Sequence, residues 1–339
     1  MIKIQEINLT LTMKNLIYSL FILLCCFSCS KQKEHPKDFY YWRSNFNISS
    51  TEKDVVKDLA VKNLYIRFFD VDKSQAIPKP IGMINGFDSK ELSVNYIPTV
   101  FITNRTFSGI SSNEVKQLAK NVNQLINDIA KAGNLTSFNE IQIDCDWTKS
   151  TRNNYFLFLE ELKQISNKQL SATLRLHQVK FKDREGIPPL DKMVLMCYAT
   201  ENPTEVEDKN SILDLNLAKD YLQNLNDYPI KLDVALPIYS WAIITNHLGK
   251  VKLLNSFTVE ELKGKPIIDK GNGIYEVTED MFLRNFYLSK GFKIKIESID
   301  KELLSQTKSF LDSKLKENYR IIYYHLDEKF TQQYDLNQL

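Results

Sequence analysis

The feature that most constrains the fold is a series of eight short apolar or alternating segments, most of which are separated by segments with helical periodicity. The predicted strands are residues 39–43, 64–70, 97–103, 140–146, 170–177, 193–198, 232–239 and 321–325. Strands that alternate with helices are typical of a parallel α/β architecture. Eight strands in this order favour a closed (β/α)8 TIM barrel over an open doubly wound sheet, so we predict an α/β barrel over residues 39–339.

Five segments between these strands have the apolar spacing of amphipathic helices. They are residues 51–62, 112–132, 153–166, 212–225 and 302–317. The helix over 112–132 is expected to stop at Gly133, a natural C′ residue. Residues 78–95 and 180–191 hold Pro and Gly and show little periodicity, so the helix signal in these two connections is weak.

The connection between the seventh and eighth predicted strands is far longer than one helix needs. It contains a hairpin-like turn at 269–273 and an alternating segment at 292–297. We therefore predict a small α+β insertion over residues 242–300.

The first 29 residues have the order of a secretory signal. Met13-Lys14-Asn15 gives a basic start, an apolar run covers residues 16–27, and Ser28 precedes Cys29. Residues 1–12 carry no such pattern, so the biological start is expected at Met13. The apolar run is shorter than the roughly 20 residues that a membrane-spanning helix takes, which favours a signal over a permanent span.

Residues 13–30 resemble the lipobox of bacterial lipoproteins, in which a cysteine is acylated before cleavage. The resemblance implies lipidation at Cys29, a membrane anchor and a place in the cell envelope, in the outer membrane and facing the periplasm or the surface. Cys26, preceded by Leu23, is an alternative site, and an ordinary cleaved signal is a second alternative. Polar residues 30–38 are expected to be a tether between the lipid and the fold.

Composition excludes several functions. Three of the five cysteines lie at 25, 26 and 29, which leaves Cys145 and Cys197 and no disulfide framework. The net charge of +2, from 44 Lys and Arg against 42 Asp and Glu, does not indicate a nucleic-acid partner. The four histidines lack metal-ligand spacing, and the chain has no glycine-rich nucleotide motif, so no metal or cofactor is implied.

The fourth predicted strand places acids on one face of the sheet. Within FNEIQIDCDW, residues 138–147, an apolar set alternates with a polar set, which consists of Gln142, Asp144 and Asp146. Period two puts the two sets on opposite faces, and we expect the polar set to point into the barrel. Buried acids are costly unless they are paired or used, so this strand is a candidate site.

The fifth strand continues the pattern, with Thr173, Arg175 and His177 predicted to point inward. Arg67 on the second strand is a further candidate lumen arginine. The two aspartates would repel each other and raise the pKa of one of them, whereas an arginine would lower it. A scaffold ion pair between Asp144 and Arg175 is the structural alternative, and His177 or His325 could assist Asp146 in carrying a proton.

The sequence at this strand resembles the chitinase-type glycoside hydrolases of family 18. Their fourth strand carries F-D-G-[IV]-D-[IL]-D-[WF]-E, and residues 138–146 follow it without a gap. The resemblance implies that Asp146 stands at the position of the proton donor and Asp144 at that of the supporting aspartate. Met196-Cys197-Tyr198 resembles M-x-Y-D of the sixth strand, and residues 236–241, LPIYSW, resemble the seventh-strand L-P-x-Y-G-x-x-W region.

This chain departs from the family pattern at catalytic positions. Asp146 is one methylene shorter than the family's Glu, Ala199 stands where M-x-Y-D has its Asp, and Tyr324-His325 ends the eighth strand where a Trp is expected. A competing register, which aligns Asp144-Cys145-Asp146-Trp147 with D-x-D-W, puts Thr148 at the catalytic position and predicts an inactive protein.

Taken with the resemblance, these residues predict an exported lipoprotein that acts on a glycan by acid-assisted cleavage. Asp146 and Asp144 are the candidate catalytic residues. The candidate sugar-binding residues are Gln142, Arg175, Tyr198, Tyr239 and Trp241. A non-catalytic glycan-binding lipoprotein is the main alternative, and an envelope protein that binds partners through the insertion is a third. Further aromatics near predicted strand ends are Tyr40, Trp42, Trp147 and Tyr324.

Overall fold

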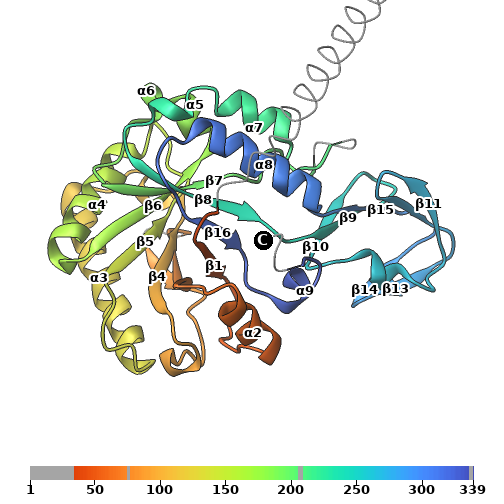
Figure 1. The fold of residues 1–339 in the computed structure, drawn as a ribbon, viewed down its shortest axis with the longest axis horizontal. Coiled ribbons are helices and arrows are strands. Elements are labelled where there is room, and N and C mark those ends of the chain that lie inside the picture. Colours follow the sequence, from red (N-terminus) through yellow and green to blue (C-terminus); the bar gives the residue numbers. More distant parts are fainter. Residues whose placement is uncertain (1–33, 75–76, 205–208, 336–338) are drawn as a thin grey trace, which may run out of the picture. The chain divides into compact units, whose positions relative to one another are not determined.

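Eight parallel strands close into a barrel in the computed structural model of the chain (Figure 1). The structure describes residues 34–74, 77–204, 209–335 and 339. The predicted signal with Cys26 and Cys29 lies outside the described residues. Residues 35–339 form one unit. No helix in the described ranges is long and apolar enough to cross a membrane.

The barrel strands follow the predicted order. They are β1 (Lys37–Tyr41), β2 (Asn63–Asp72), β4 (Asn95–Ile102), β5 (Glu140–Asp144), β6 (Gln169–Arg175), β7 (Lys192–Met196), β8 (Lys231–Pro237) and β16 (Ile321–Tyr324). The sheet runs β1-β16-β8-β7-β6-β5-β4-β2 and closes through a parallel pairing of β1 with β2. A short strand, β3 (Lys79–Ile81), is added antiparallel to β2. The predicted TIM barrel and its eight strands are confirmed.

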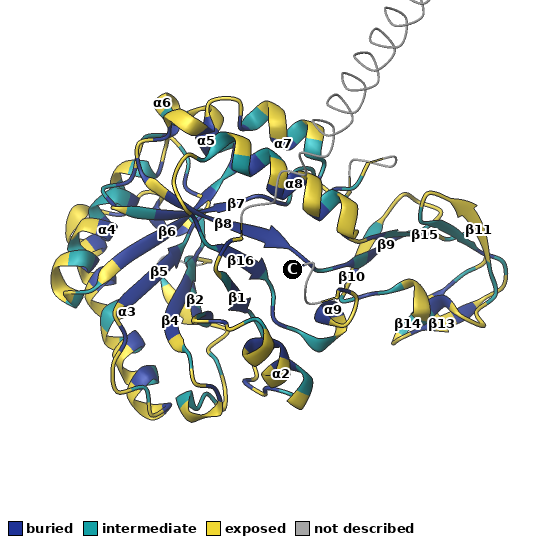
Figure 2. Cartoon of the chain, in the orientation of Figure 1, coloured by how far each residue is buried: buried dark blue, intermediate teal, exposed yellow. Residues whose placement is uncertain are grey.

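The five predicted helices are present, but the one predicted over residues 212–225 is much shorter and covers only residues 215–221. The main helices are α2 (Ser50–Asp58), α3 (Ser112–Ala132), α4 (Arg152–Ser166), α7 (Leu215–Tyr221) and α8 (Lys301–Lys314). The weak connection after β6 holds only α5 (Leu176–Lys180) and α6 (Lys182–Glu185), and α9 (Glu328–Thr331) follows the last strand. Ser49 and Ser111 each begin a helix with a capping box, to Glu52 and Glu114. The strands that these helices cover are largely buried (Figure 2).

Gly133 ends α3, but not in the left-handed conformation that a C′ glycine adopts. Its φ is −89°, and it is Asn134 that has a positive φ of 59°. A Cβ at position 133 would lie 2.2 Å from Cδ1 of Phe87. Glycine is therefore needed here for a close approach and not for a turn.

The predicted tether overlaps the fold. The His35 ring is buried, with Nε2 2.7 Å from Asp312 Oδ1 and Nδ1 3.1 Å from the Tyr319 carbonyl oxygen. The carbonyl of Pro36 accepts from the backbone N–H of Ile321 at 2.9 Å, and β1 begins at Lys37. The last four residues of the predicted 30–38 tether thus belong to the folded unit.

The insertion between β8 and β16 lies at one end of the barrel and has a core of its own (Figure 1). Its antiparallel sheet runs β10 (Val251–Asn255), β9 (Trp241–Thr245), β15 (Lys293–Glu297), β12 (Ile274–Val277) and β11 (Ile267–Gly271). A hairpin of β13 (Met281–Leu283) and β14 (Phe286–Leu288) completes it, and its described helical content is one 3-10 turn, Val259–Leu262. The predicted 269–273 turn joins β11 and β12.

A polar cluster closes the barrel where its strands begin. Lys192 Nζ lies 2.9 Å from Glu140 Oε2, 3.3 Å from Asp233 Oδ2 and 3.1 Å from the Tyr65 hydroxyl. We call Lys192, Glu140 and Asp233 the basal cluster. Because it fills this end, the space inside the barrel opens at the carboxyl ends of the strands, where barrels of this type hold their sites.

Candidate functional site

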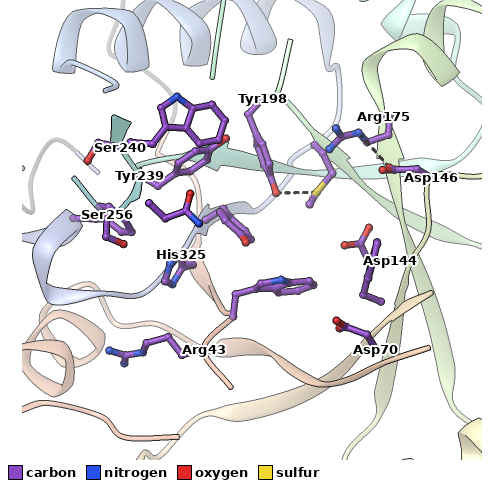
Figure 3. A pocket seen from close by; sticks show the side chains of 17 residues that line it. Arg43, Asp70, Asp144, Asp146, Arg175, Tyr198, Tyr239, Ser240, Ser256 and His325 are labelled. Carbon is purple, nitrogen blue, oxygen red and sulfur yellow. Dashed lines mark hydrogen bonds and ion pairs between the residues drawn. The ribbon is translucent and has the colours of Figure 1, made fainter. Parts of the chain in front are cut away.

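A cavity of about 520 Å³ lies at the carboxyl ends of the barrel strands, beside the insertion (Figure 3). Its lining comprises Trp42, Arg43, Asp70, Phe101, Asp144, Asp146, Arg175, Met196, Tyr198, Tyr239, Ser240, Trp241, Asn255, Ser256, Tyr324, His325 and Phe330. This volume lies within the usual range of small-ligand sites. The cavity brings together six of the seven candidate catalytic and sugar-binding residues.

Asp144, the last residue of β5, points into the cavity, as the alternation predicted. Its Oδ1 accepts a hydrogen bond from the Thr173 hydroxyl at 2.7 Å, and its other oxygen has no hydrogen-bond partner among the described residues. Burial, reinforced by the charge of Asp146, raises the pKa of the Asp144 carboxyl to about 7. This carboxyl can therefore hold a proton near neutral pH.

Asp146 lies at the mouth of the same cavity and is paired with Arg175. Its Oδ1 is 3.3 Å from Arg175 Nε, and its side chain is 52% exposed. Within the described chain, no ion pair joins Arg175 to Asp144, so the scaffold alternative for those two residues is wrong. The arginine instead compensates the outer of the two acids.

The structure favours the first of the two sequence registers. Asp146 lines the cavity, whereas the Trp147 side chain is fully buried and stacks on Tyr155 of α4 with ring centroids 5.3 Å apart. Thr148 does not line the cavity, and its hydroxyl instead lies 3.0 Å from that of Ser150. The position that aligns with the family's proton donor is thus occupied by an acid.

A third acid, Asp70, was not predicted to belong to the site. The register of β2 against β4 shifts between Arg67 and Phe69, which turns Asp70 toward the cavity. Arg67 binds it through two hydrogen bonds, Nε to Oδ1 at 2.6 Å and Nη2 to Oδ2 at 2.5 Å. The candidate lumen arginine Arg67 therefore neutralises Asp70 at the edge of the cavity.

Aromatic rings form much of the cavity wall. The Tyr239 ring lies 6.1 Å from Tyr198, 5.6 Å from Tyr324 and 5.3 Å from Trp241, measured between centroids. Trp42 lies 5.8 Å from Tyr324 on the other side. Five of the seven aromatics predicted near strand ends line the cavity, while Tyr40 and Trp147 are buried outside its lining.

A buried glutamate from the insertion holds Trp241 in this wall. Trp241 Nε1 donates to Glu297 Oε2 at 2.8 Å, and the same oxygen accepts from the backbone N–H of Ser211 at 3.1 Å and from its hydroxyl. Lys295 Nζ lies 2.6 Å from the other oxygen. Glu297 thus ties the insertion to the loop after β7 and fixes one ring of the cavity.

Gln142 does not reach the cavity. It is fully buried one pleat below Asp144, where its Oε1 accepts from the Tyr40 hydroxyl at 2.8 Å and its Nε2 faces the Ser171 hydroxyl at 3.5 Å. Because both ends of the amide are used inside the barrel, Gln142 supports the cavity floor, and its predicted contact with a ligand is not supported by this position.

The two histidines near the strand ends differ in placement. The prediction that His177 points into the lumen is wrong, because β6 ends at Arg175 and His177 belongs to α5. His325 lines the cavity, and burial lowers the pKa of its imidazole to about 4. His325 is therefore neutral at physiological pH and can serve the site as a hydrogen-bonding group.

Several lining residues were not predicted from the sequence to belong to the site. Ser240, Asn255 and Ser256 belong to the loop after β8 and to the insertion. Their only sequence signal was their position within the LPIYSW segment, for Ser240, or within the long connection, for Asn255 and Ser256. Within the described ranges, no group of three or more His, Cys, Asp and Glu side chains has an arrangement that could hold a metal ion.

These features define the class of protein, a (β/α)8 barrel with carboxyl groups in an aromatic-walled cavity at the carboxyl ends of its strands. No family model matches the chain, and no curated protein matches it in sequence.

Solved structures with the same fold do exist. The spore cortex-lytic enzyme SleL of Bacillus cereus has 15% identity and a TM-score of 0.55, over 90% of this chain and 76% of SleL. SleL of Bacillus megaterium QM B1551 has 16% identity and a TM-score of 0.54, over 91% of this chain and 75% of the other. A chitinase of Chromobacterium violaceum has 12% identity and a TM-score of 0.53, over 90% and 98%. The chain therefore has the chitinase-type barrel fold that its sequence resembled.

Proposed function

We propose that this protein acts on a glycan, which it binds in the aromatic-walled cavity and cleaves with acid assistance from the Asp144 and Asp146 pair. The observation that carries the proposal is the presence of both carboxyls in one cavity at the carboxyl ends of a closed barrel. One acid with a pKa near neutrality beside an ion-paired one is the arrangement that acid-assisted glycosidic cleavage uses. The chitinase and cortex-lytic enzymes that share the fold favour the same substrate class.

The cavity wall supports a sugar ligand independently of the acids. Tyrosine and tryptophan offer apolar ring faces together with polar edges, which suits the apolar faces and hydroxyl edges of pyranose rings. Tyr198, Tyr239, Trp241 and Tyr324 supply these rings, and the Arg175 side chain, 26% exposed, supplies hydrogen-bond donors.

The direct test is to incubate the purified mature protein with N-acetylglucosamine oligosaccharides, muramyl glycans and other β-linked oligosaccharides, and to follow new reducing ends. We expect turnover with one of these classes and saturable binding in calorimetry. Asp191→Asn, whose side chain is 80% exposed, is the matched control and should keep full activity. Turnover that survives unchanged when both Asp144 and Asp146 are replaced by Asn would refute the proposed site.

A non-catalytic glycan-binding protein is the second candidate. One observation favours it: the residue at the family's proton-donor position is a shortened acid held by Arg175. This alternative predicts saturable oligosaccharide binding without new reducing ends, abolished by Tyr239→Ala or Trp241→Ala. Unchanged binding by both variants would exclude the aromatic wall as the sugar-binding surface.

We further propose that Cys29 is acylated and anchors the protein in the cell envelope. The order of basic start, apolar run and cysteine in residues 13–29 supports this, and the fold begins at His35, six residues later. Labelling cells with an alkynyl palmitate analogue should mark the wild-type protein but not Cys29→Ser, with Cys26→Ser as the control. Label that is lost in Cys26→Ser alone would move the anchor to the alternative site.

A further inference from the structure

We infer that Asp144, and not Asp146, is the proton donor of the site, and that Asp146 acts as a carboxylate. The inference rests on the proposed glycan cleavage and deepens it by dividing the two roles. It reverses the assignment implied by the family motif, in which the outer position carries the acid.

The distribution of positive charge around the cavity is the first argument. Three arginines lie in the cavity wall or beside it, and each is bound to a carboxylate other than Asp144. Arg175 pairs with Asp146, Arg67 with Asp70, and Arg43 with Glu52 at 2.8 Å. Asp144 is therefore the acid of the cavity that forms no ion pair within the described chain.

The groups that face Asp144 are mostly neutral or acidic. Beside Thr173 and Arg175 they are Asp70, Asp146 and the tyrosines Tyr40, Tyr198 and Tyr324. Phenols buried in this way stay protonated, so they offer no positive charge. The surroundings thus favour the protonated form of the Asp144 carboxyl, in line with its raised pKa.

The position of each oxygen is the second argument. Thr173 donates to Oδ1 of Asp144 and fixes the carboxyl plane, while Oδ2 has no hydrogen-bond partner in the described chain. A proton on Oδ2 is therefore available to a ligand in the cavity. Asp146, in contrast, stands at the mouth, where its Oδ1 is paired with the Arg175 guanidinium and acts as an acceptor.

The bond changes balance with these roles. Asp144 gives its proton to the glycosidic oxygen as the bond from that oxygen to the anomeric carbon breaks, and the leaving sugar departs as an alcohol. The Asp146 carboxylate stabilises the positive charge that develops at the anomeric carbon. Water then adds to that carbon and returns a proton to the Asp144 carboxylate, so one water is consumed and one hydroxyl appears on each product.

Leaving-group dependence tests the assignment, because a good leaving group needs no proton from the enzyme. We would compare an N-acetylglucosamine oligosaccharide with its 2,4-dinitrophenyl glycoside. Asp144→Asn should lose about 10²–10⁴-fold in kcat/KM on the oligosaccharide and far less on the activated glycoside. Asp146→Asn should lose activity on both substrates. The inference would be overturned if Asp146→Asn, and not Asp144→Asn, lost activity on the oligosaccharide but largely kept it on the activated glycoside.

A second measurement tests the protonation of Asp144 without any substrate. Carbon-13 NMR of aspartate carboxyls should show one group that titrates near pH 7 in the wild type and is missing in Asp144→Asn but present in the Asp191→Asn control. No such group would overturn the inference even if turnover is found. If the wild type binds the oligosaccharide but cleaves neither substrate, the inference fails while glycan binding stands. If it neither binds nor cleaves any glycan, the proposed function fails as well.

Discussion

The wild type should lose stability as the pH rises from about 4 to about 7, and replacing Asp144 with Asn should abolish this loss. The ordinary pKa of an aspartate is 3.8, and burial together with Asp146 raises that of Asp144 to about 7 in the folded protein. The folded state therefore binds this proton more tightly than the unfolded state. With respect to this group, the free energy of unfolding is highest below about pH 4, falls as the pH rises toward 7, and is level above that.

The size of the effect follows from the difference between the two pKa values. The two pKa values of Asp144, 3.8 and about 7, differ by about 3, which corresponds to about 4 kcal/mol in the free energy of unfolding. Asn has the shape of the protonated acid and no charge to desolvate. Asp144→Asn should thus match the wild type at pH 4 and exceed its stability by up to about 4 kcal/mol at pH 8. Asp146→Asn should show part of this gain, since the Asp146 charge contributes to the raised pKa.

Urea unfolding of each variant at pH 4, 5, 6, 7 and 8, followed by fluorescence, measures the difference directly. Asp191→Asn should follow the wild type throughout, because its side chain is 80% exposed. A stability difference between Asp144→Asn and the wild type that does not change with pH would refute the raised pKa, and with it the argument that Asp144 holds a proton at neutral pH.

Two further substitutions test how the fold supports the cavity. Lys192→Met should cost about 3–5 kcal/mol in urea unfolding, because it leaves the two carboxylates of the basal cluster buried and unpaired; the exposed pair partner Lys163→Met is the control and should cost under about 1 kcal/mol. A cost for Lys192→Met as small as that of the control would mean that the basal cluster is already solvated. Glu297→Ala should weaken oligosaccharide binding and change the fluorescence of Trp241, because the indole N–H loses its acceptor. Unchanged binding and emission would mean that packing alone holds that ring.

The barrel could be predicted because its signals are local. Each strand shows its own alternation, and the outward set on β5, such as Ile141 and Ile143, packs under the helices as expected. The same alternation placed Asp144 and Arg175 at the cavity. These inferences need only the period of a strand and the rule that barrel sites lie at carboxyl ends.

The site residues that were missed or misplaced depend on structural details that the alternation of a strand does not encode. The irregular register near Phe69 changes the face on which Asp70 lies, and a one-residue slip in a strand always has that effect. His177 was misplaced because the chain turns into a helix directly after Arg175. Gln142 shares the inward face with Asp144 but is too deep to reach the cavity. Lining residues from the insertion require tertiary contacts that are remote in sequence.

The energetics of Asp144 connect the fold to the proposed chemistry. A chain selected for stability alone would gain from an uncharged amide at this position, such as Gln142, which occupies the next inward position on the same strand and makes one hydrogen bond at each end of its amide. Arg175 forms its ion pair with Asp146 instead, so Asp144 has no ion-pair partner within the described chain. A buried acid that raises the free energy of the folded state at neutral pH is expected where a protein needs a proton to give away. If Asp144→Asn both stabilises the protein at pH 8 and removes cleavage of an unactivated glycan, one carboxyl accounts for the instability and for the activity.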